Sequence, residues 1–215
     1  MTISNESRST IKKVFEPIAL AMGRAGLTPN GLTLIGFAIT VIGSILVGLQ
    51  LWVVGGLVVF VGGVFDMFDG TLARATGKAS TFGAFMDSTF DKAGEIIVFL
   101  GVIAGMQAAG AEDVNILVGA AALGASIMVS YARAKSDGLG YSSGMGLAAV
   151  GLMPREIRLV LISFGIVLTG TGIGISAIEF ALGVILVGAV ITVIQRILFV
   201  RHEDQQQSTP TTPAH

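Results

Sequence analysis

The sequence predicts an all-α integral membrane protein with six transmembrane helices and an N-terminal amphipathic helix at the membrane interface. Of its 215 residues, 53% are hydrophobic and only 13% are charged, whereas soluble domains carry about 25% charged residues. The mean hydropathy is +0.83, so too little polar surface remains to cover a globule in water, and a bilayer fits this composition. The net charge of −1 gives no indication of nucleic-acid binding, and the absence of cysteine excludes disulfides and thiolate metal ligands.

The N-terminal segment combines a polar start with an amphipathic stretch. Between Ile11 and Met22, apolar side chains alternate with Lys12, Lys13 and Glu16. This pattern predicts a helix over about residues 8–24 that lies in the interface. A short connecting helix is the alternative interpretation.

Six apolar segments follow, each bounded by polar or glycine-rich breaks. A helix needs about 20 apolar residues to cross a hydrocarbon core of roughly 30 Å. The predicted spans are residues 32–49, 52–74, 82–106, 116–134, 157–168 and 175–198, and the fifth is the shortest. Glycines concentrate in these spans, which favours close helix packing. The membrane domain therefore covers residues 1–202, and residues 203–215, rich in Gln, Ser, Thr and Pro, are expected to form a disordered tail.

The basic residues are confined to one side of this predicted topology. All 13 Lys and Arg lie in or close to the N-terminal segment, the connection between spans two and three, the connection between spans four and five, or the C-terminus. The three loops on the other side contain none. Because Lys and Arg accumulate in cytoplasmic loops, both termini of this multi-pass protein are expected on the cytoplasmic side of the cell membrane.

Four aspartates lie at the predicted cytoplasmic ends of spans two and three: Asp66, Asp69, Asp87 and Asp91. At about 100° per residue, the first two are about 60° apart and the last two about 40° apart, so each pair shares a helix face. The connecting turn is short, which makes the two helices antiparallel neighbours. Four acids held together repel one another unless a cation binds between them. Such hard oxygen ligands suit Mg²⁺, Mn²⁺ or Ca²⁺ rather than zinc.

Small residues accompany the acids in a fixed register. Gly70 and Ala73 lie on the arc of the first aspartate pair, and Gly83 lies one turn before Asp87. Their lack of bulk leaves room for a ligand against the helix backbone, and Arg74 supplies a planar fork of donors for a phosphate. Each residue alone has an ordinary structural explanation, but the register across two helices indicates a phosphate-binding metal site.

The spacing D-x2-D-G-x2-A-R-x8-G-x3-D-x3-D, from Asp66 to Asp91, resembles the signature of the CDP-alcohol phosphotransferase family at every defined position. The six spans and the Leu27-Thr28-Pro29-Asn30 segment before the first span are similar to that family as well. The resemblance implies that Mg²⁺ or Mn²⁺ is the cofactor. It assigns the metal to Asp66, Asp69 and Asp87, with Asp91 as a further ligand or as the general base.

The resemblance also implies a substrate pair and a reaction. The CDP moiety of a CDP-activated lipid, either CDP-diacylglycerol or an ether analogue, is expected at Asn30, Asp69, Gly70, Ala73, Arg74 and Gly83. A polar alcohol would attack the lipid-bearing phosphorus with release of CMP, and Asp91, the deepest of the four acids along its helix, would take the hydroxyl proton. The family resemblance further implies a homodimer.

A second set of basic residues is expected to bind a phosphate on the acceptor alcohol: Arg133, Lys135, Arg155, Arg158 and Arg196. Arg155 and Arg158 lie one turn apart at a helix N-terminus, which itself attracts anions. Ordinary positive-inside anchoring is the alternative explanation. The segments 130–135, 151–159 and 195–196 resemble the branch of the family that uses inositol 1-phosphate. That branch usually has a proline after its first arginine, whereas here Pro154 precedes Arg155. Glycerol 3-phosphate, which gives phosphatidylglycerophosphate, is the alternative acceptor.

Two other classes of protein compete with this interpretation. A divalent-cation transporter would carry acids along the depth of the membrane, and here only Glu95 continues the stripe one turn beyond Asp91. The alternative for Glu95 is a partner for Lys92 or for a metal ligand. A structural scaffold with a degenerate site is the third class, and it is disfavoured because every motif position is filled.

Overall fold

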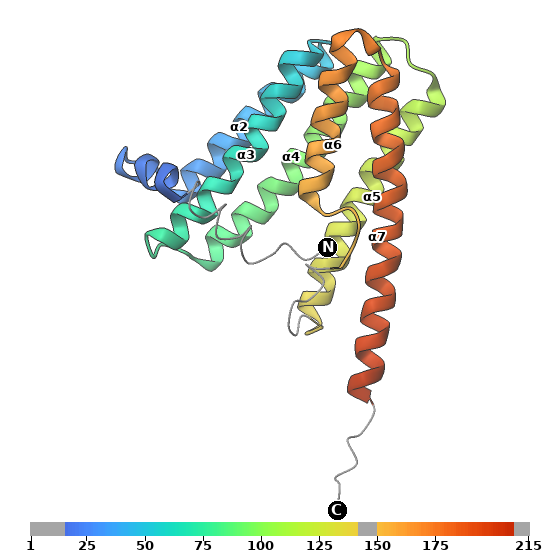
Figure 1. The fold of residues 1–215 in the computed structure, drawn as a ribbon. Coiled ribbons are helices and arrows are strands. Elements are labelled where there is room, and N and C mark those ends of the chain that lie inside the picture. The colour runs from blue at the N-terminus through green and yellow to red at the C-terminus, as the bar shows by residue number, and fades with distance from the viewer. Residues whose placement is uncertain (1–15, 142–149, 209–215) are drawn as a thin grey trace, which may run out of the picture.

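The computed structural model describes residues 16–141 and 150–208, and these residues form helices without any strand (Figure 1). A helix over residues 16–24 precedes α2 (Pro29–Gly48), α3 (Trp52–Ala75), α4 (Thr81–Ala108), α5 (Asp113–Gly138), α6 (Arg155–Leu168) and α7 (Ser176–Ser208). A π-helical turn, η2 (Thr169–Ile173), follows α6. Each predicted span therefore coincides with a helix whose ends differ from the prediction by a few residues, apart from the longer α7.

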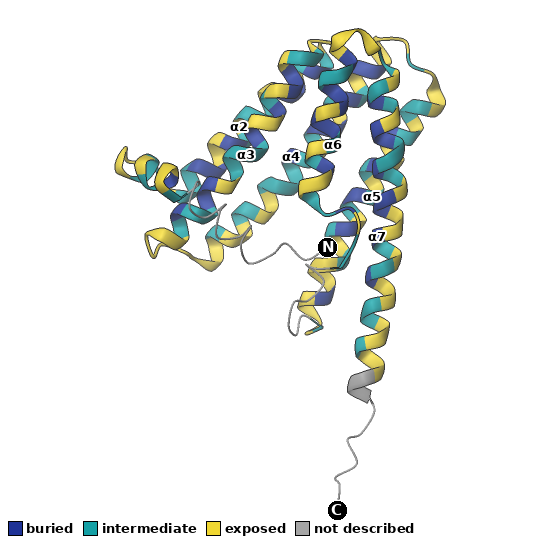
Figure 2. Cartoon of the chain, viewed as in Figure 1, coloured by how far each residue is buried: buried dark blue, intermediate teal, exposed yellow. Residues whose placement is uncertain are grey.

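Within the described ranges, five helical segments are long and apolar enough to cross a membrane. α4 has 28 residues, but charged side chains, among them Asp87, Asp91 and Glu95, lie between its start and its middle and shorten its apolar stretch. Large apolar side chains point outward: Leu117 is 67% exposed and Phe180 76%. Exposed positions occur along the whole length of the helices (Figure 2). A surface of this kind fits contact with lipid rather than water.

The helices form two groups that meet through α6 and through a contact between α4 and α5. α2 packs against α3 and α4, α5 packs against α7, and α6 contacts both α3 and α7 (Figure 1). One apolar core connects all six, with contributions from Val47, Val59, Phe99, Ala122, Ile166 and Leu182 in chain order. Because α6 lies between the groups, its first residues reach the ends of α3 and α4.

Glycines allow α2 and α3 to pack closely against each other. A Cβ on Gly43 of α2 would lie 2.7 Å from the backbone nitrogen of Val59, and a Cβ on Gly55 of α3 would lie 2.8 Å from that of Val47. Real Cβ atoms do not approach a backbone so closely, so these residues must be glycine for α2 and α3 to pack at this distance. The predicted role of small residues in helix packing is confirmed at this contact.

The helix over residues 16–24 lies across the ends of α2 and α3 (Figure 1). Its Ala19 is completely buried against Leu32, Phe68 and Leu72, whereas Ile18 is 44% exposed. The predicted helix began at about residue 8, and residues 8–15 lie outside the described part. Its interfacial location stays a prediction.

The C-terminal helix is longer than predicted. α7 continues through residues 203–208, so the expected disordered tail is wrong there, and residues 209–215 lie outside the described part. Glu and Gln are good helix formers, and extending an existing helix needs no new nucleation. Tyr141, just after α5, donates a hydrogen bond of 2.7 Å to Asp204 Oδ1, which fixes the extension against the end of α5.

Candidate active site

The end of α3 and the start of α4 bring three predicted metal ligands together. Asp66, Asp69 and Asp87 each offer a carboxylate oxygen, and these oxygens lie within 4.8 Å of one another. Residues 76–80 form the short connection that makes α3 and α4 antiparallel, as predicted. Since all the ligands are carboxylate oxygens, the group fits a hard divalent cation such as Mg²⁺ or Mn²⁺.

Asp69 is oriented by two neighbours. Its side chain is buried, its Oδ2 accepts a 2.5 Å hydrogen bond from the Thr33 hydroxyl of α2, and its Oδ1 accepts one from the Gly70 N–H. Partners of this kind fix the direction of a metal-binding carboxylate. Thr33 was not predicted as a site residue. It lies one turn beyond Asn30 on the same side of α2, and this helical spacing was the signal available in the sequence.

The predicted nucleotide-binding residues line one cavity beside the aspartates, which is called the nucleotide cavity below. Its wall contains Asn30, Asp69, Gly70, Ala73, Arg74 and Gly83, together with Asp87. Lys78 and Ser80, from the connection between α3 and α4, add a cation and a hydroxyl that the prediction did not include. The structure thus gathers the small residues of the motif and Arg74, the predicted phosphate-binding arginine, around a common space.

Two glycines keep this cavity open. A Cβ on Gly70 would lie 3.2 Å from Arg74 Nη1, and a Cβ on Gly83 would lie 3.3 Å from Asn30 Oδ1. Both contacts are tighter than most Cβ contacts, so a larger residue at either position would displace a side chain of the wall.

Asp91 lies outside the three-carboxylate group and pairs with Arg155 of α6. Arg155 Nη2 is 2.8 Å from Asp91 Oδ1, and Arg155 Nη1 is 2.9 Å from Asp66 Oδ2. One guanidinium therefore connects the candidate base to the candidate metal ligands. The two roles predicted for Asp91, metal ligand and base, stay predictions, and the described geometry groups it with Arg155.

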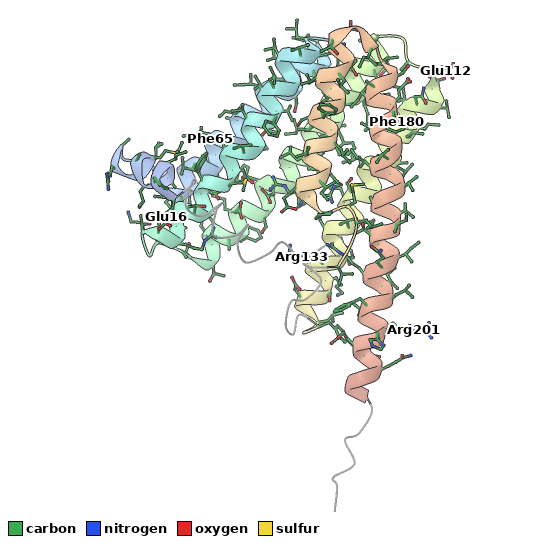
Figure 3. All side chains as sticks on the ribbon, in the orientation of Figure 1. Glu16, Phe65, Glu112, Arg133, Phe180 and Arg201 are labelled. Carbon is green, nitrogen blue, oxygen red and sulfur yellow. The ribbon has the colours of Figure 1, made fainter. Side chains whose placement is uncertain are left out.

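The structure places the five predicted acceptor-binding cations in different environments. Arg155 reaches the aspartates and is 32% exposed, while Arg133 and Lys135 are exposed on α5. Figure 3 shows Arg133 on the part of α5 that extends past the start of α6, and its Nε is 3.8 Å from Asp137 Oδ2.

The remaining two arginines are enclosed by protein partners. Arg158 is only 2% exposed; its Nε and Nη2 lie 2.7 and 2.6 Å from Glu95 Oε1. Arg196 is 4% exposed and donates to the carbonyls of Val129 and Val150. The acceptor-binding role predicted for Arg158 and Arg196 stays a prediction, and in the described residues both guanidiniums are bonded to protein acceptors. An unpaired guanidinium inside a membrane domain has a high energetic cost, and these acceptors offset it.

A second cavity lies beneath Asp91, between α2, α3, α4 and α6. The charged residues of its wall are Asp66, Asp91, Glu95, Arg155 and Arg158, and the rest is mainly apolar, including Phe37, Val98 and Leu159. Glu95 also lies 3.2 Å from Lys92 Nζ, which confirms the predicted Lys92 partner. Its contact with Arg158 was not predicted, because the two residues lie 63 positions apart.

Comparison with known sequences relates the chain to lipid-synthesising enzymes. The sequence model of the family described as CDP-alcohol phosphatidyltransferase matches residues 26–195. Over 168 residues the chain is 33% identical to archaetidylinositol phosphate synthase of Pyrococcus horikoshii, and the alignment covers 78% of this chain and 84% of the relative. Over 215 residues it is 30% identical to phosphatidylinositol phosphate synthase of Streptomyces avermitilis, and this alignment covers 97% of this chain and 86% of the relative.

Solved structures give the same relationship. Phosphatidylinositol phosphate synthase of Mycobacterium tuberculosis with CDP-DAG bound matches with a TM-score of 0.78 at 26% identity, over 94% of this chain and 98% of that one. Its complex with manganese and citrate matches with a TM-score of 0.77 at 27% identity, over 94% and 92% of the two chains.

Proposed function

The chain belongs to the CDP-alcohol phosphatidyltransferase family, and we propose that it transfers a phosphatidyl group from CDP-diacylglycerol to inositol 1-phosphate, with release of CMP. One observation carries the proposal: the nucleotide cavity, the group of three aspartates and the Asp91–Arg155 pair adjoin one another. The relatives named for inositol phosphate products, and the relative that binds CDP-DAG, support the choice of substrates.

The donor is assigned to the nucleotide cavity. Arg74 and Lys78 provide positive charge for the pyrophosphate, and Gly70 leaves room for it beside the helix. A divalent cation held by Asp66, Asp69 and Asp87 would offset negative charge on the pyrophosphate and on the departing CMP. Thr33 and the Gly70 N–H keep the Asp69 carboxylate in position for that cation.

The acceptor is assigned to the space beside Asp91 and Arg155. Asp91 takes the proton of the attacking hydroxyl while that oxygen bonds to the lipid-bearing phosphorus and the bond from this phosphorus to the CMP oxygen breaks. The proton then passes to water. A guanidinium carries five N–H donors, and Arg155 uses two nitrogens on Asp66 and Asp91. Its other donors are therefore available for the phosphate of the acceptor.

The proposed topology places this site at the cytoplasmic face of a cell membrane. In Figure 3, Arg133 and Arg201 lie toward one end of the molecule and Glu112 and Phe180 toward the other. We include α4 as the sixth span, because its apolar second half lies beside α2 and α5 and its charged half faces the site. Positive charge at the cytoplasmic end supports this orientation.

A divalent-cation pathway receives less support from the site. Three aspartates gather at one end, and Glu95, the next acid along α4, is paired with Arg158 and Lys92. A cation moving past Glu95 would have to displace both partners. The geometry favours a bound cation that stays in place over one that is transported.

The test is CMP release by the purified protein in detergent with CDP-diacylglycerol and Mg²⁺. Inositol 1-phosphate, inositol, glycerol 3-phosphate and serine are added in turn. We expect release that depends on inositol 1-phosphate. Release with glycerol 3-phosphate alone would keep the aspartate chemistry and reject the acceptor, whereas no release with any alcohol, even with an ether-linked CDP-lipid, would reject the proposed function.

A further inference from the structure

We propose that Glu95 is a positioning residue for the acceptor, acting through Arg158 on the first turn of α6 and so on Arg155. The inference rests on the proposed function, since it assigns Arg155 to the phosphorylated acceptor. Glu95 lines the second cavity, beneath Asp91, and is bonded there to Arg158 and Lys92, whereas the described wall of the nucleotide cavity does not include it.

The contact between Glu95 and Arg158 is buried and closely made. The two side chains are 9% and 2% exposed, and two guanidinium nitrogens lie 2.7 and 2.6 Å from one carboxylate oxygen. The other carboxylate oxygen of Glu95 is 3.2 Å from Lys92 Nζ. The Nε contact is a charge-assisted hydrogen bond and the Nη2 contact is a buried ion pair. Such contacts are strong, so Glu95 fixes where the Arg158 guanidinium lies.

Arg158 passes this constraint to the segment before α6. Its Nη1 donates a 2.9 Å hydrogen bond to the Met153 carbonyl, and its own N–H bonds to the Pro154 carbonyl at 3.2 Å. The Met153 N–H in turn donates to Thr192 Oγ1 of α7 at 3.0 Å. A continuous set of polar contacts therefore runs from α4 through the start of α6 to α7.

Arg155 is the first residue of α6 and lies inside this fixed turn. Its guanidinium meets Asp66 on α3 and Asp91 on α4 at 2.9 and 2.8 Å. Displacing a reacting or binding group by about 1 Å can reduce a rate by roughly 100-fold. The Glu95–Arg158 pair thus sets the position of the cation that would hold the acceptor phosphate beside the base.

The key variant is Glu95→Gln, which keeps the shape of the side chain and removes its charge. We expect kcat/KM for inositol 1-phosphate to fall by about 10- to 100-fold, with most of the change in KM. The KM for CDP-diacylglycerol should stay near that of the wild type, because the nucleotide cavity is separate. The matched control is Glu179→Gln. Glu179 lies in the first turn of α7 and accepts a hydrogen bond from Asn115 of α5, and its replacement should leave both constants unchanged.

A double-mutant cycle tests whether Glu95 acts through Arg155. In an Arg155→Ala background, Glu95→Gln should cause little further loss, because the residue it positions is already absent. Full additivity of the two losses would overturn the proposal. If Glu95→Gln raised the KM for inositol 1-phosphate and the KM for CDP-diacylglycerol equally, the proposal would be overturned as well, since such a result would indicate general damage.

A second variant separates positioning from folding. Replacing both members by leucine (Glu95→Leu with Arg158→Leu) removes the buried charges together, and such replacements often preserve stability. We expect this protein to unfold at nearly the wild-type temperature and still to show the acceptor defect. Wild-type acceptor kinetics in the double variant would show that the pair is structural only.

The variants are assayed with the phosphorylated acceptor that supports wild-type turnover. If the acceptor assignment is wrong, the wild-type protein already fails to turn over inositol 1-phosphate. If the role of Glu95 is wrong, the wild-type protein is active and only the kinetics of the variants differ from those expected.

Discussion

At the scale of single residues, Asp69 shows how the protein controls a carboxylate that repels its neighbours. It is 5% exposed and lies near two other aspartates, yet Thr33 and the Gly70 N–H each donate to one of its oxygens. These donors hold the charged oxygens toward the group, where a cation can satisfy them. The threonine hydroxyl is therefore as much a part of the candidate metal site as the ligands.

Replacing Thr33 by valine removes this hydroxyl with little change in shape. We expect Thr33→Val to weaken Mn²⁺ binding by about 10-fold or more, because partners behind metal ligands typically contribute 10- to 100-fold in affinity. The measurement is Mn²⁺ titration of the purified protein. Asp87→Asn should abolish Mn²⁺ binding and serves as the reference for complete loss of affinity.

The matched control is Thr89→Val, because Thr89 donates only within its own helix, to the Phe85 carbonyl. If Thr33→Val kept the wild-type Mn²⁺ affinity while Asp87→Asn bound no Mn²⁺, the Thr33 hydroxyl would not be what orients Asp69.

At the scale of elements, the contact between α2 and α3 determines the register of the site. Gly43 lies against the backbone of Val59, and a Cβ on Gly36 would lie 3.4 Å from the backbone nitrogen of Asp66. Thr33 can reach Asp69 only because the two helices are this close. Packing within the membrane domain and geometry at its polar end are therefore linked along one helix pair.

We predict that Gly43→Ala lowers both stability and metal affinity. The added Cβ would lie 2.7 Å from a backbone nitrogen, so the helices must separate, and overpacking of this kind costs about 1–3 kcal/mol. Thermal unfolding in detergent and Mn²⁺ titration measure the two effects. Gly124→Ala is the control, because nothing lies within 4 Å of its added Cβ, and a wild-type unfolding temperature in Gly43→Ala would contradict the packing argument.

At the scale of the whole molecule, α6 joins the group α2–α3–α4 to the pair α5–α7 (Figure 1). Its first turn supplies Arg155 to the aspartates, and its later turns pack in the apolar core through Ile162 and Ile166. The site therefore belongs to the junction between the two groups, and movement of one group relative to the other would change the distance from Arg155 to Asp91.

The proposed topology predicts which positions a membrane-impermeant maleimide can reach. The chain has no cysteine, so single cysteines at exposed Ala75 and Ala109, which flank α4, report on opposite ends of that helix. Ala109→Cys should be labelled in intact cells, and Ala75→Cys only after permeabilisation. The cysteine-free parent controls for background, and labelling of both positions in intact cells would show that α4 does not cross the membrane as proposed.

The sequence alone determined the helices and the acidic motif. Long apolar runs defined each helix because a membrane domain must satisfy its backbone hydrogen bonds within the segment. Helical periodicity placed Asp66 with Asp69, and the short connection brought Asp87 beside them. The positions of Gly70, Ala73, Arg74 and Gly83 followed from the same periodicity, and all four line the nucleotide cavity.

Only the tertiary structure decided which partner each remaining polar group takes. Arg155 and Arg158 looked equivalent in the sequence, yet one meets Asp66 and Asp91 while the other is enclosed by Glu95. Thr33 and Asp69, 36 positions apart, likewise meet only through helix packing. Periodicity fixes the face of a helix on which a residue lies, whereas the neighbouring helix, its distance and its register depend on side-chain packing across the whole domain, and these select the partner of each charge.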